Sequence, residues 1–316
     1  MKKIKKLWGW CTYMTSWDKK IAIIIPAYNE ELTIKQVILD FKNHIPEAEI
    51  FVIDNNSTDA TNKLAEEEAR VLFEPKQGKS NAIKKAFREI DADIYVMVDG
   101  DSTYFAEDVH KLLQPVLDGR ADVVVGDRVN YQTENKRLFH NFGNVLVRNL
   151  INKLFGVNLK DIMSGYRALS KNFVKNYSIL VEGFELETDI TLQAINKNFT
   201  IVEVPVRYKD RPLESPSKLN TFHDGFLVLR RIFTIFKNYK PLLFFGVIGV
   251  ILFIAALACG IPVFLEFVKT RYITHVPLSI LSTGLMLVSF LSFFTGIILD
   301  VILQMFQDLR EVINNK

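Results

Sequence analysis

Two aspartates separated by one glycine, Asp99 and Asp101, are the best candidates in this sequence for binding a divalent cation. Mg²⁺ and Mn²⁺ prefer oxygen ligands, and such an ion can bridge the two phosphates of a diphosphate. The pair follows an apolar run, Ile94–Val98, that is typical of a buried strand. A second pair, Asp91 and Asp93, precedes that run, so we expect it at the opposite end of the strand in turn or capping roles. The sequence therefore predicts a Mg²⁺ or Mn²⁺ site at Asp99 and Asp101.

Polar residues also follow four other apolar runs. In an open parallel sheet, ligands bind outside the carboxyl ends of the strands. One polar turn is ordinary for a surface loop, but five in succession predict a single polar crevice. The other four turns are Pro26-Ala27-Tyr28-Asn29-Glu30, Asp54-Asn55-Asn56-Ser57-Thr58-Asp59, Lys76-Gln77-Gly78-Lys79 and Gly126-Asp127-Arg128.

Short β-branched runs alternate with stretches of helical spacing from Lys19 onward. This alternation is typical of an α/β fold with a mostly parallel, Rossmann-like sheet and helices on its faces. We expect the second helix to be capped by Ser57 or Thr58. The expected strands are 21–25, 50–53, 71–73, 94–98 and 123–125, and the expected helices are 32–41, 58–69 and 80–90.

Two uncharged apolar runs lie near the C-terminus, at Leu242–Leu265 and Val276–Leu299. Each would span about 36 Å as a helix, more than the roughly 30 Å of a bilayer core. They predict a transmembrane hairpin with Glu266–His275 as its connector. Four basic residues precede the hairpin and two lie in the connector, so the positive-inside rule places the large N-terminal region in the cytoplasm. Glycines at 246, 249, 284 and 296 permit close packing, within the hairpin or between subunits of a homo-oligomer.

Charge is concentrated in two segments, because residues 1–20 and 207–240 each carry a net +5 in a chain of net +3. This pattern favours an anionic surface or ligand and does not favour nucleic acid. Residues 221–240 read as an interfacial amphipathic helix. Residues 1–18 suit either a membrane interface or a disordered basic tail. The expected organisation is then 1–18, a catalytic domain at 19–220, the amphipathic helix, a hairpin at 241–305 and a tail at 306–316.

Several motifs together resemble glycosyltransferase family 2, which has the GT-A nucleotide-sugar fold. With the hairpin they are similar to the polyprenyl-phosphate branch, which includes bactoprenol glucosyltransferases and dolichol-phosphate mannose synthases. The first three motifs are the polar turns at Pro26–Glu30 and Asp54–Asp59 and the Asp99-Gly100-Asp101 pair. The others are Asp161-Ile162-Met163-Ser164-Gly165-Tyr166-Arg167, Gly183-Phe184-Glu185-Leu186-Glu187-Thr188, Val204-Pro205-Val206-Arg207-Tyr208 and Ser217-Lys218-Leu219-Asn220.

The resemblance implies a donor site at the polar turns. Asp54 would bind the base, and Asp99 and Asp101 would hold the metal on the diphosphate. The sequence departs from the family pattern at Asn55 and Asn56, which replace an Asp and a Gly, but Asp54 is retained. The nucleoside site would be lined by Pro26, Ala27, Tyr28 and Glu30, with Gly78 and Lys79 near the nucleotide.

The resemblance also implies a phosphate-binding region for the acceptor. Arg128 would bind phosphate, and Asp161 would position the sugar or the acceptor. Glu185, Glu187 and Asp189 suit either a substrate role or a helix start. Further candidates are Arg137 with Asn141 for the acceptor phosphate, Arg167, and Arg207, Arg211 and Lys218 for closing over the phosphates.

The function implied is metal-dependent, inverting transfer of a sugar from a nucleotide sugar to polyprenyl phosphate such as undecaprenyl phosphate. A phosphate monoester is largely dianionic at pH 7, so the acceptor needs no general base. UDP-glucose is the favoured donor, with UDP-N-acetylglucosamine and GDP-mannose as alternatives. A processive synthase would need more membrane helices, and a non-catalytic scaffold would not need Asp54, Asp99 and Asp101. The uncharged hairpin predicts a tether, so a separate flippase would move the product.

Overall fold

The computed structural model describes residues 19–128, 138–178, 186–209 and 233–314, and no side chains at 138–144, 307 and 310–314. The chain divides into two units, one of residues 1–138 and 148–218 and one of residues 139–147 and 219–316. Each unit is described by itself.

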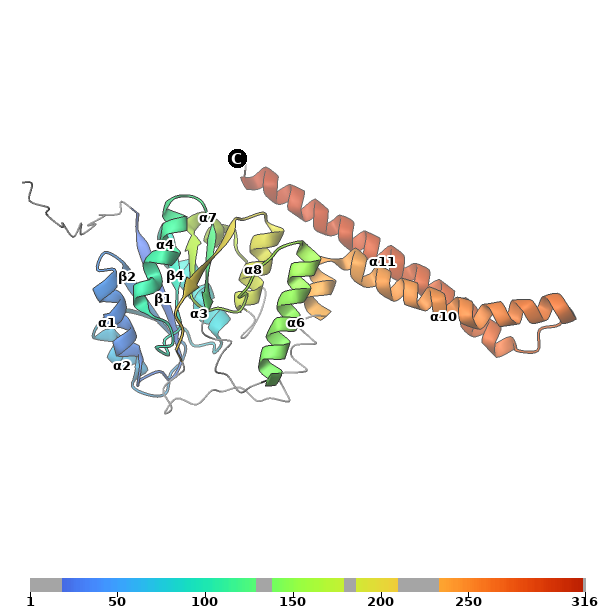
Figure 1. Cartoon of the computed structure of the whole chain (residues 1–316), viewed down its shortest axis with the longest axis horizontal. Helices are drawn as coiled ribbons and strands as arrows, with labels where there is room; N and C mark the ends of the chain where they lie inside the picture. The colour runs from blue at the N-terminus through green and yellow to red at the C-terminus, as the bar shows by residue number, and fades with distance from the viewer. Residues whose placement is uncertain (1–18, 129–137, 179–185, 210–232, 315–316) are drawn as a thin grey trace, which may run out of the picture. The chain divides into compact units, whose positions relative to one another are not determined.

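The first unit is built on a seven-stranded sheet with the order β3-β2-β1-β4-β6-β5-β7. Figure 1 labels three of its strands, β1, β2 and β4. β6 runs antiparallel to both of its neighbours, and all other pairs are parallel. This confirms the expected mostly parallel α/β sheet. The strands are β1 Ile21–Ala27, β2 Glu49–Asp54, β3 Arg70–Phe73, β4 Ile94–Met97, β5 Val123–Arg128, β6 Arg167–Ser170 and β7 Ile201–Val206.

Helices cover both faces of this sheet. Side chains alternate along a strand, so Ile23 and Ile25 of β1 lie in one apolar core with residues of α1 and α4. Ile24 lies in a second core with residues of α3 and α8. The two cores fix the sheet between two helical layers and leave the strand ends for the loops. The helices of this unit are α1 Ile34–His44, α2 Thr61–Glu66, α3 Lys79–Glu89, η1 Ala106–Asp108, α4 Val109–Leu117, α7 Lys171–Asn176 and α8 Leu186–Asn196. A further helix, α6 Leu138–Phe155, has residues in both units.

The predicted start of the second helix was wrong. α2 begins at Thr61, and its N-cap residue makes no side-chain capping bond. Thr58 instead donates its backbone N–H to the Asn29 side chain at 2.8 Å, and the Ser57 hydroxyl accepts from the Asn29 N–H at 3.1 Å. These residues are used to join two loops, so they cannot cap the helix.

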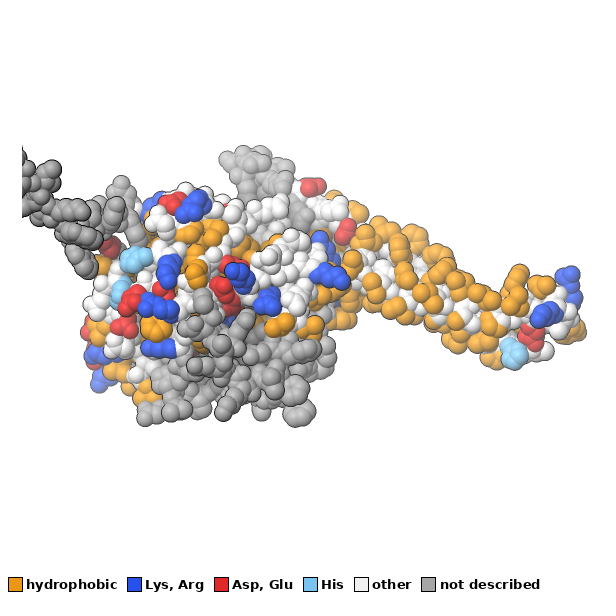
Figure 2. All heavy atoms as spheres, in the orientation of Figure 1, with side chains coloured by type: hydrophobic (Ala, Val, Ile, Leu, Met, Phe, Trp, Pro, Cys, Tyr) orange, Lys and Arg blue, Asp and Glu red, His pale blue; other side chains and the backbone are white. Residues whose placement is uncertain are grey.

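The second unit contains two long apolar helices, α10 Pro241–Thr270 and α11 Val276–Asn314. Residues 241–270 and 276–306 are long and apolar enough to cross a membrane, and apolar side chains cover most of the hairpin surface (Figure 2). The connector is shorter than predicted, because α10 continues to Thr270 and Arg271 ends it in the left-handed conformation. Of the segment expected to form an amphipathic helix, residues 233–239 are helical and 221–232 lie outside the described residues.

The hairpin helices pack through small residues. Three serines of α11 donate to backbone carbonyls of α10: Ser282 to Ala256, Ser289 to Gly249 and Ser292 to Phe245, each at 2.8–2.9 Å. A Cβ added at Gly296 would lie 3.3 Å from the Leu242 Cα, whereas one at Gly284 would meet nothing within 4 Å. Close packing at Gly296 therefore lies within the hairpin, and Gly284 lies on an open face.

Candidate functional site

The Asp99-Gly100-Asp101 turn follows β4 and is held from two sides. The hydroxyl of Thr33, before α1, donates to the Gly100 carbonyl at 2.7 Å. Asp101 is buried, and its Oδ1 accepts from the Thr103 hydroxyl at 2.6 Å and from the Thr103 N–H at 3.1 Å. A Cβ added at Gly165 would lie 2.5 Å from Asp99 Oδ2. The absence of a side chain at residue 165 therefore leaves the space that the Asp99 carboxylate occupies.

Lys79, the first residue of α3, bridges two carboxylates. Its Nζ lies 2.5 Å from Asp99 Oδ1 and 2.6 Å from Glu187 Oε1 on α8. Burial alone would lower the pKa of Lys79, but the two negative charges outweigh burial and raise it well above its ordinary value. Lys79 is therefore a fixed cation. The sequence placed Lys79 near the nucleotide but did not identify Glu187 as its partner.

Asp99 and Asp101 place two carboxylates on one turn, where the sequence predicts a divalent cation. Within the described part of the chain, no group of three or more Asp, Glu, His or Cys side chains is arranged to hold a metal. Two carboxylates suit a cation that takes its other oxygen ligands from a diphosphate and water. The chemistry of these two carboxylates therefore fits Mg²⁺ or Mn²⁺.

The departure from the family pattern at Asn55 has a structural role. Asn55 is buried, and its Nδ2 donates to the carbonyls of Glu74 at 3.2 Å and Lys76 at 2.8 Å. Its Oδ1 accepts from the Gly78 N–H at 2.6 Å. An aspartate could not make the two donor bonds. Asn55 thus shapes the loop that ends at Lys79, a role that local sequence does not reveal.

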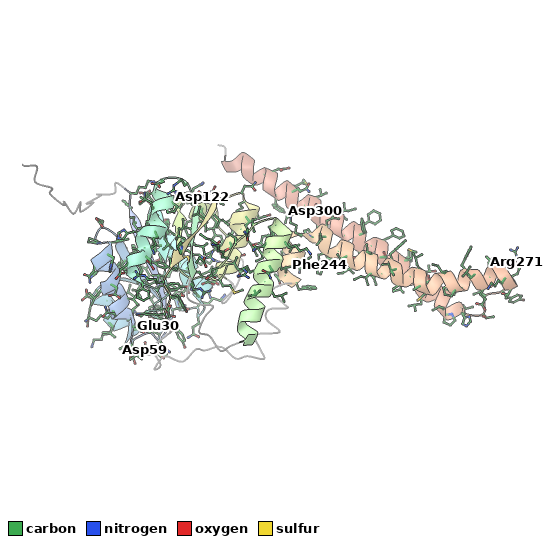
Figure 3. The ribbon with its side chains drawn as sticks, in the orientation of Figure 1. Glu30, Asp59, Asp122, Phe244, Arg271 and Asp300 are labelled. Carbon is green, nitrogen blue, oxygen red and sulfur yellow. The ribbon has the colours of Figure 1, made fainter. Side chains whose placement is uncertain are left out.

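The expected nucleoside-binding loop is tied to the loop after β2. The N–H of Glu30 donates to the Thr61 hydroxyl at 2.8 Å. Asp54 is buried, and its carboxylate accepts from the Ser57 N–H at 3.1 Å and from Asn62 at 3.3 Å. Figure 3 shows Glu30 and Asp59 together at one end of the sheet, away from Asp122, which precedes β5. Pro26 and Ala27 end β1 at this edge, followed directly by Tyr28.

Arg128 and Asp161 form a bidentate pair. Nε lies 2.6 Å from Oδ2 and Nη2 lies 3.0 Å from Oδ1, with about one-eighth of each side chain exposed. The Arg128 guanidinium also lies over the Tyr208 ring, 5.3 Å from its centroid. Burial, and then the charge of Asp161, raise the pKa of the neighbouring Asp127. The structure thus brings Arg128 and Asp161 together at the carboxyl end of β5.

The loop that carries Asp161 is anchored by an acidic residue that the sequence did not single out. The Glu203 carboxylate, on β7, accepts the backbone N–H groups of Lys160 and Asp161 at 2.8 Å. Burial raises the pKa of Glu203. Glu203 lies opposite Val125 in the parallel β5–β7 pair. This strand pairing brings Glu203 close to the Asp161 loop although the two are far apart in sequence, so the sequence did not indicate the contact.

The structure describes three of the remaining candidate residues, Arg207, Asp189 and Arg167. Arg207 pairs with Glu107 at 2.5 Å and with Asp108 at 3.2 Å. Asp189 accepts a bond from the Tyr177 hydroxyl at 2.8 Å. Arg167 is fully buried. Arg137, Glu185, Arg211, Lys218 and the side chain of Asn141 lie outside the described residues.

The second acidic pair lies at the amino end of β4, as expected from its position. Asp91 forms an ion pair with Lys171 at 2.8 Å, and Asp93 accepts the Lys20 N–H at 2.9 Å. Lys20 precedes β1 and Lys171 follows the antiparallel β6, so this pair has a local structural role at the amino end of β4.

Comparison with known proteins places these residues in a family. A family model described as glycosyl transferase family 2 matches residues 22–178. Glycosyltransferase AglJ of Haloferax volcanii is 30% identical over 291 residues, which cover 91% of this chain and 95% of that protein. A dolichyl-phosphate hexose transferase of the same organism is 30% identical over 207 residues, covering 65% of this chain and 89% of that one.

Solved structures agree on the fold. Glucosyl-3-phosphoglycerate synthase of Mycobacterium tuberculosis, in complex with Mn²⁺, UDP and glucosyl-3-phosphoglycerate, superimposes with a TM-score of 0.56. The identity is 21%, and the match covers 70% of this chain and 80% of the synthase. At this identity the likeness shows a shared GT-A fold alone.

Proposed function

The chain belongs to glycosyl transferase family 2, and from this membership we infer that it transfers a sugar from a nucleotide-sugar donor to a polyprenyl phosphate. The observation that carries the proposal is the Lys79–Asp99–Glu187 group at the carboxyl end of β4 in a chain that also has two helices able to span a membrane. The first feature has one cation and two carboxylates, so it would bind the anionic nucleotide through a divalent cation held by the carboxylates. The second feature suits a lipid acceptor. A relative whose name is dolichyl-phosphate hexose transferase supports the acceptor class.

On the donor side, the chain's own residues orient an anionic substrate. Asp99 and Asp101 would hold a Mg²⁺ or Mn²⁺ ion, which would neutralise charge on the departing nucleoside diphosphate. Lys79 adds a fixed positive charge beside Asp99, and Asn55 fixes the loop from which Lys79 extends. Asp54, Tyr28 and Glu30 would surround the nucleoside.

On the acceptor side, the protein must position the acceptor phosphate rather than remove a proton from it. The phosphate monoester is already a nucleophile at pH 7. Arg128 would attract it, and the bidentate bond with Asp161 holds the guanidinium in one orientation. Attack of a phosphate oxygen at the anomeric carbon forms one C–O bond and breaks the bond to the diphosphate, which inverts the configuration. Asp161 then acts as an orienting group, and no base is required.

We propose glucose as the sugar and UDP-glucose as the donor, because the two-helix form resembles bacterial glucosyltransferases. UDP-N-acetylglucosamine and GDP-mannose are the alternatives. We place the catalytic domain on the cytoplasmic side, because four basic residues precede the hairpin and two lie in its connector. The hairpin acts as a tether, and a separate flippase would move the product.

The proposal is tested by incubating membranes that contain the protein with undecaprenyl phosphate and each radiolabelled donor, and then counting label in the lipid extract. We expect label from one donor, abolished by Asp101→Ala and by chelation of divalent cations. Nucleotide-sugar binding without label in lipid would instead support a non-catalytic scaffold. Full activity of Asp101→Ala would exclude its role in holding the metal.

A further inference from the structure

Arg167, the first residue of β6, has a fully buried guanidinium that donates to three neutral oxygens. Nη2 lies 2.7 Å from the Ile162 carbonyl and Nε lies 2.8 Å from the Ser164 carbonyl. Nη1 lies 2.9 Å from the Thr191 hydroxyl on α8. Two of the three bonds therefore hold one loop, and the third holds a helix.

Such burial is costly. Removing a charged group from water costs several kcal/mol, and arginine does not escape by losing its proton. An apolar side chain would fill the same space without this cost. A planar guanidinium, however, can donate in three fixed directions, which neither an apolar side chain nor lysine can do. The geometry of the three bonds is thus what distinguishes arginine here.

The strand register places Arg167 between the two parts of the site. β6 is antiparallel to both neighbours, and Arg167 lies opposite Met97 of β4 and Val125 of β5. Asp99 follows Met97 by two residues, and Arg128 follows Val125 by three. Arg167 is therefore beside the ends of both strands that carry these groups.

Each bond of Arg167 leads to one part of the site. The Ile162 and Ser164 carbonyls belong to the loop of Asp161, which binds Arg128. On the other side, the Thr191 hydroxyl also donates to the Glu187 carbonyl at 2.9 Å. The Glu187 side chain binds Lys79, which binds Asp99, so one guanidinium connects the Asp99 side to the Asp161 side.

We propose that Arg167 is a positioning residue that fixes the separation between the Asp99–Lys79–Glu187 group and the Arg128–Asp161 pair. This proposal rests on the proposed function, in which the Asp99–Lys79–Glu187 group binds the donor and the Arg128–Asp161 pair orients the acceptor phosphate. Arg167 itself touches neither substrate. Its effect is to hold the anomeric carbon and the attacking oxygen in the relative position that the reaction requires.

Substitution of Arg167 itself risks unfolding, so the decisive variant is Thr191→Val. Valine removes the hydroxyl that connects Arg167 with α8 and leaves the guanidinium in place. Thr191→Ser keeps the hydroxyl and is the matched control. A displacement of about 1 Å can cost roughly a hundredfold in rate, so we expect Thr191→Val to lower kcat about tenfold to a hundredfold. KM for donor and acceptor should each change by less than about threefold, since each half-site stays intact.

A second readout does not need activity. Amide hydrogen exchange in residues 160–166 should become faster in Thr191→Val and remain unchanged in Thr191→Ser. Unchanged kcat and exchange in Thr191→Val would overturn the proposal, as would a rise in one substrate's KM with kcat intact, or an equal loss in Thr191→Ser. If the wild-type protein transfers no sugar to polyprenyl phosphate, the proposed function fails, and the exchange result alone decides whether Arg167 couples the loop to α8.

Discussion

The side-chain oxygen of Asn55 accepts a 2.6 Å hydrogen bond from the N–H of Gly78, the residue before α3. The same side chain donates to two carbonyls of that loop, Glu74 and Lys76. One buried amide thus determines how the chain enters α3, and Lys79 is the first residue of that helix. The position of the fixed cation depends on a residue 24 positions earlier.

Asn55→Asp should therefore weaken donor binding. The change keeps the size of the side chain but removes both N–H donors and adds a charge facing two carbonyls. Leaving buried polar groups unsatisfied costs about 1–3 kcal/mol, and we expect a Kd for the nucleoside diphosphate about tenfold higher by titration calorimetry. Asn56→Asp adds the same charge at an exposed neighbour and should change little. Equal effects of the two substitutions would show that charge alone is responsible.

Gly165→Ala should impair catalysis with little loss of stability. Its Cβ would lie 2.5 Å from Asp99 Oδ2, so the carboxylate must rotate away. This movement is easy for the end of a side chain but displaces the carboxylate that binds Lys79 and that, under the proposed function, would hold the metal on the donor. We expect a fall in kcat/KM of about tenfold or more, because a misplacement of about 1 Å can cost roughly a hundredfold in rate. Lys79 keeps its ion pair with Glu187. The thermal midpoint should stay near that of wild type, and a large drop would instead indicate a folding defect.

Five of the seven strands of the sheet could be predicted from local sequence, whereas β6, β7 and the partners within the site could not. Apolar runs such as Ile21–Ile25 and Ile94–Val98 indicated strands, and the polar residues after them indicated the functional edge. β6 was missed because four residues beginning with Arg167 carry no strand pattern of their own. Its antiparallel place is set by pairing with β4 and β5.

Long-range contacts account for the other omissions. Lys79 and Glu187 are 108 residues apart, and nothing near either residue indicates the other. Glu203 contacts the Asp161 loop only because β7 pairs with β5. Arg207 stays a predicted phosphate ligand, and its pairing with Glu107 and Asp108 is another contact that local sequence did not indicate. Charge and spacing indicate that an arginine can bind an anion, but only the fold determines which anion is near.

The hairpin offers a paired test of helix packing. Gly296→Val should destabilise it, because a Cβ there would meet the Phe245 Cβ at 3.1 Å and the Leu242 Cα at 3.3 Å. Overpacking of this kind costs about 1–3 kcal/mol. Gly284→Val is the control, since a Cβ there meets nothing within 4 Å. We expect a lower thermal midpoint in detergent for the first substitution only. A comparable loss from Gly284→Val would point to a contact outside the hairpin, such as one between subunits.

Asp127→Asn should stabilise the protein in a pH-dependent manner. Burial and the charge of Asp161 raise the pKa of Asp127, so the folded protein holds this proton more tightly than the unfolded chain does. The contribution of the Asp127 carboxyl to the stability of the fold is fully present below the ordinary carboxyl pKa of about 4. This contribution is lost as the pH rises through the raised pKa of the folded state. The Asp127→Asn variant has no carboxyl at this position and does not lose this stability. Its thermal midpoint should therefore exceed that of wild type at pH 7.5 and approach that of wild type near pH 4. The control is Asp118→Asn, because Arg120 lowers the pKa of that exposed carboxyl and the substitution should give no gain at pH 7.5. An Asp127→Asn gain that is the same at both pH values would show that the carboxylate charge is not its cause.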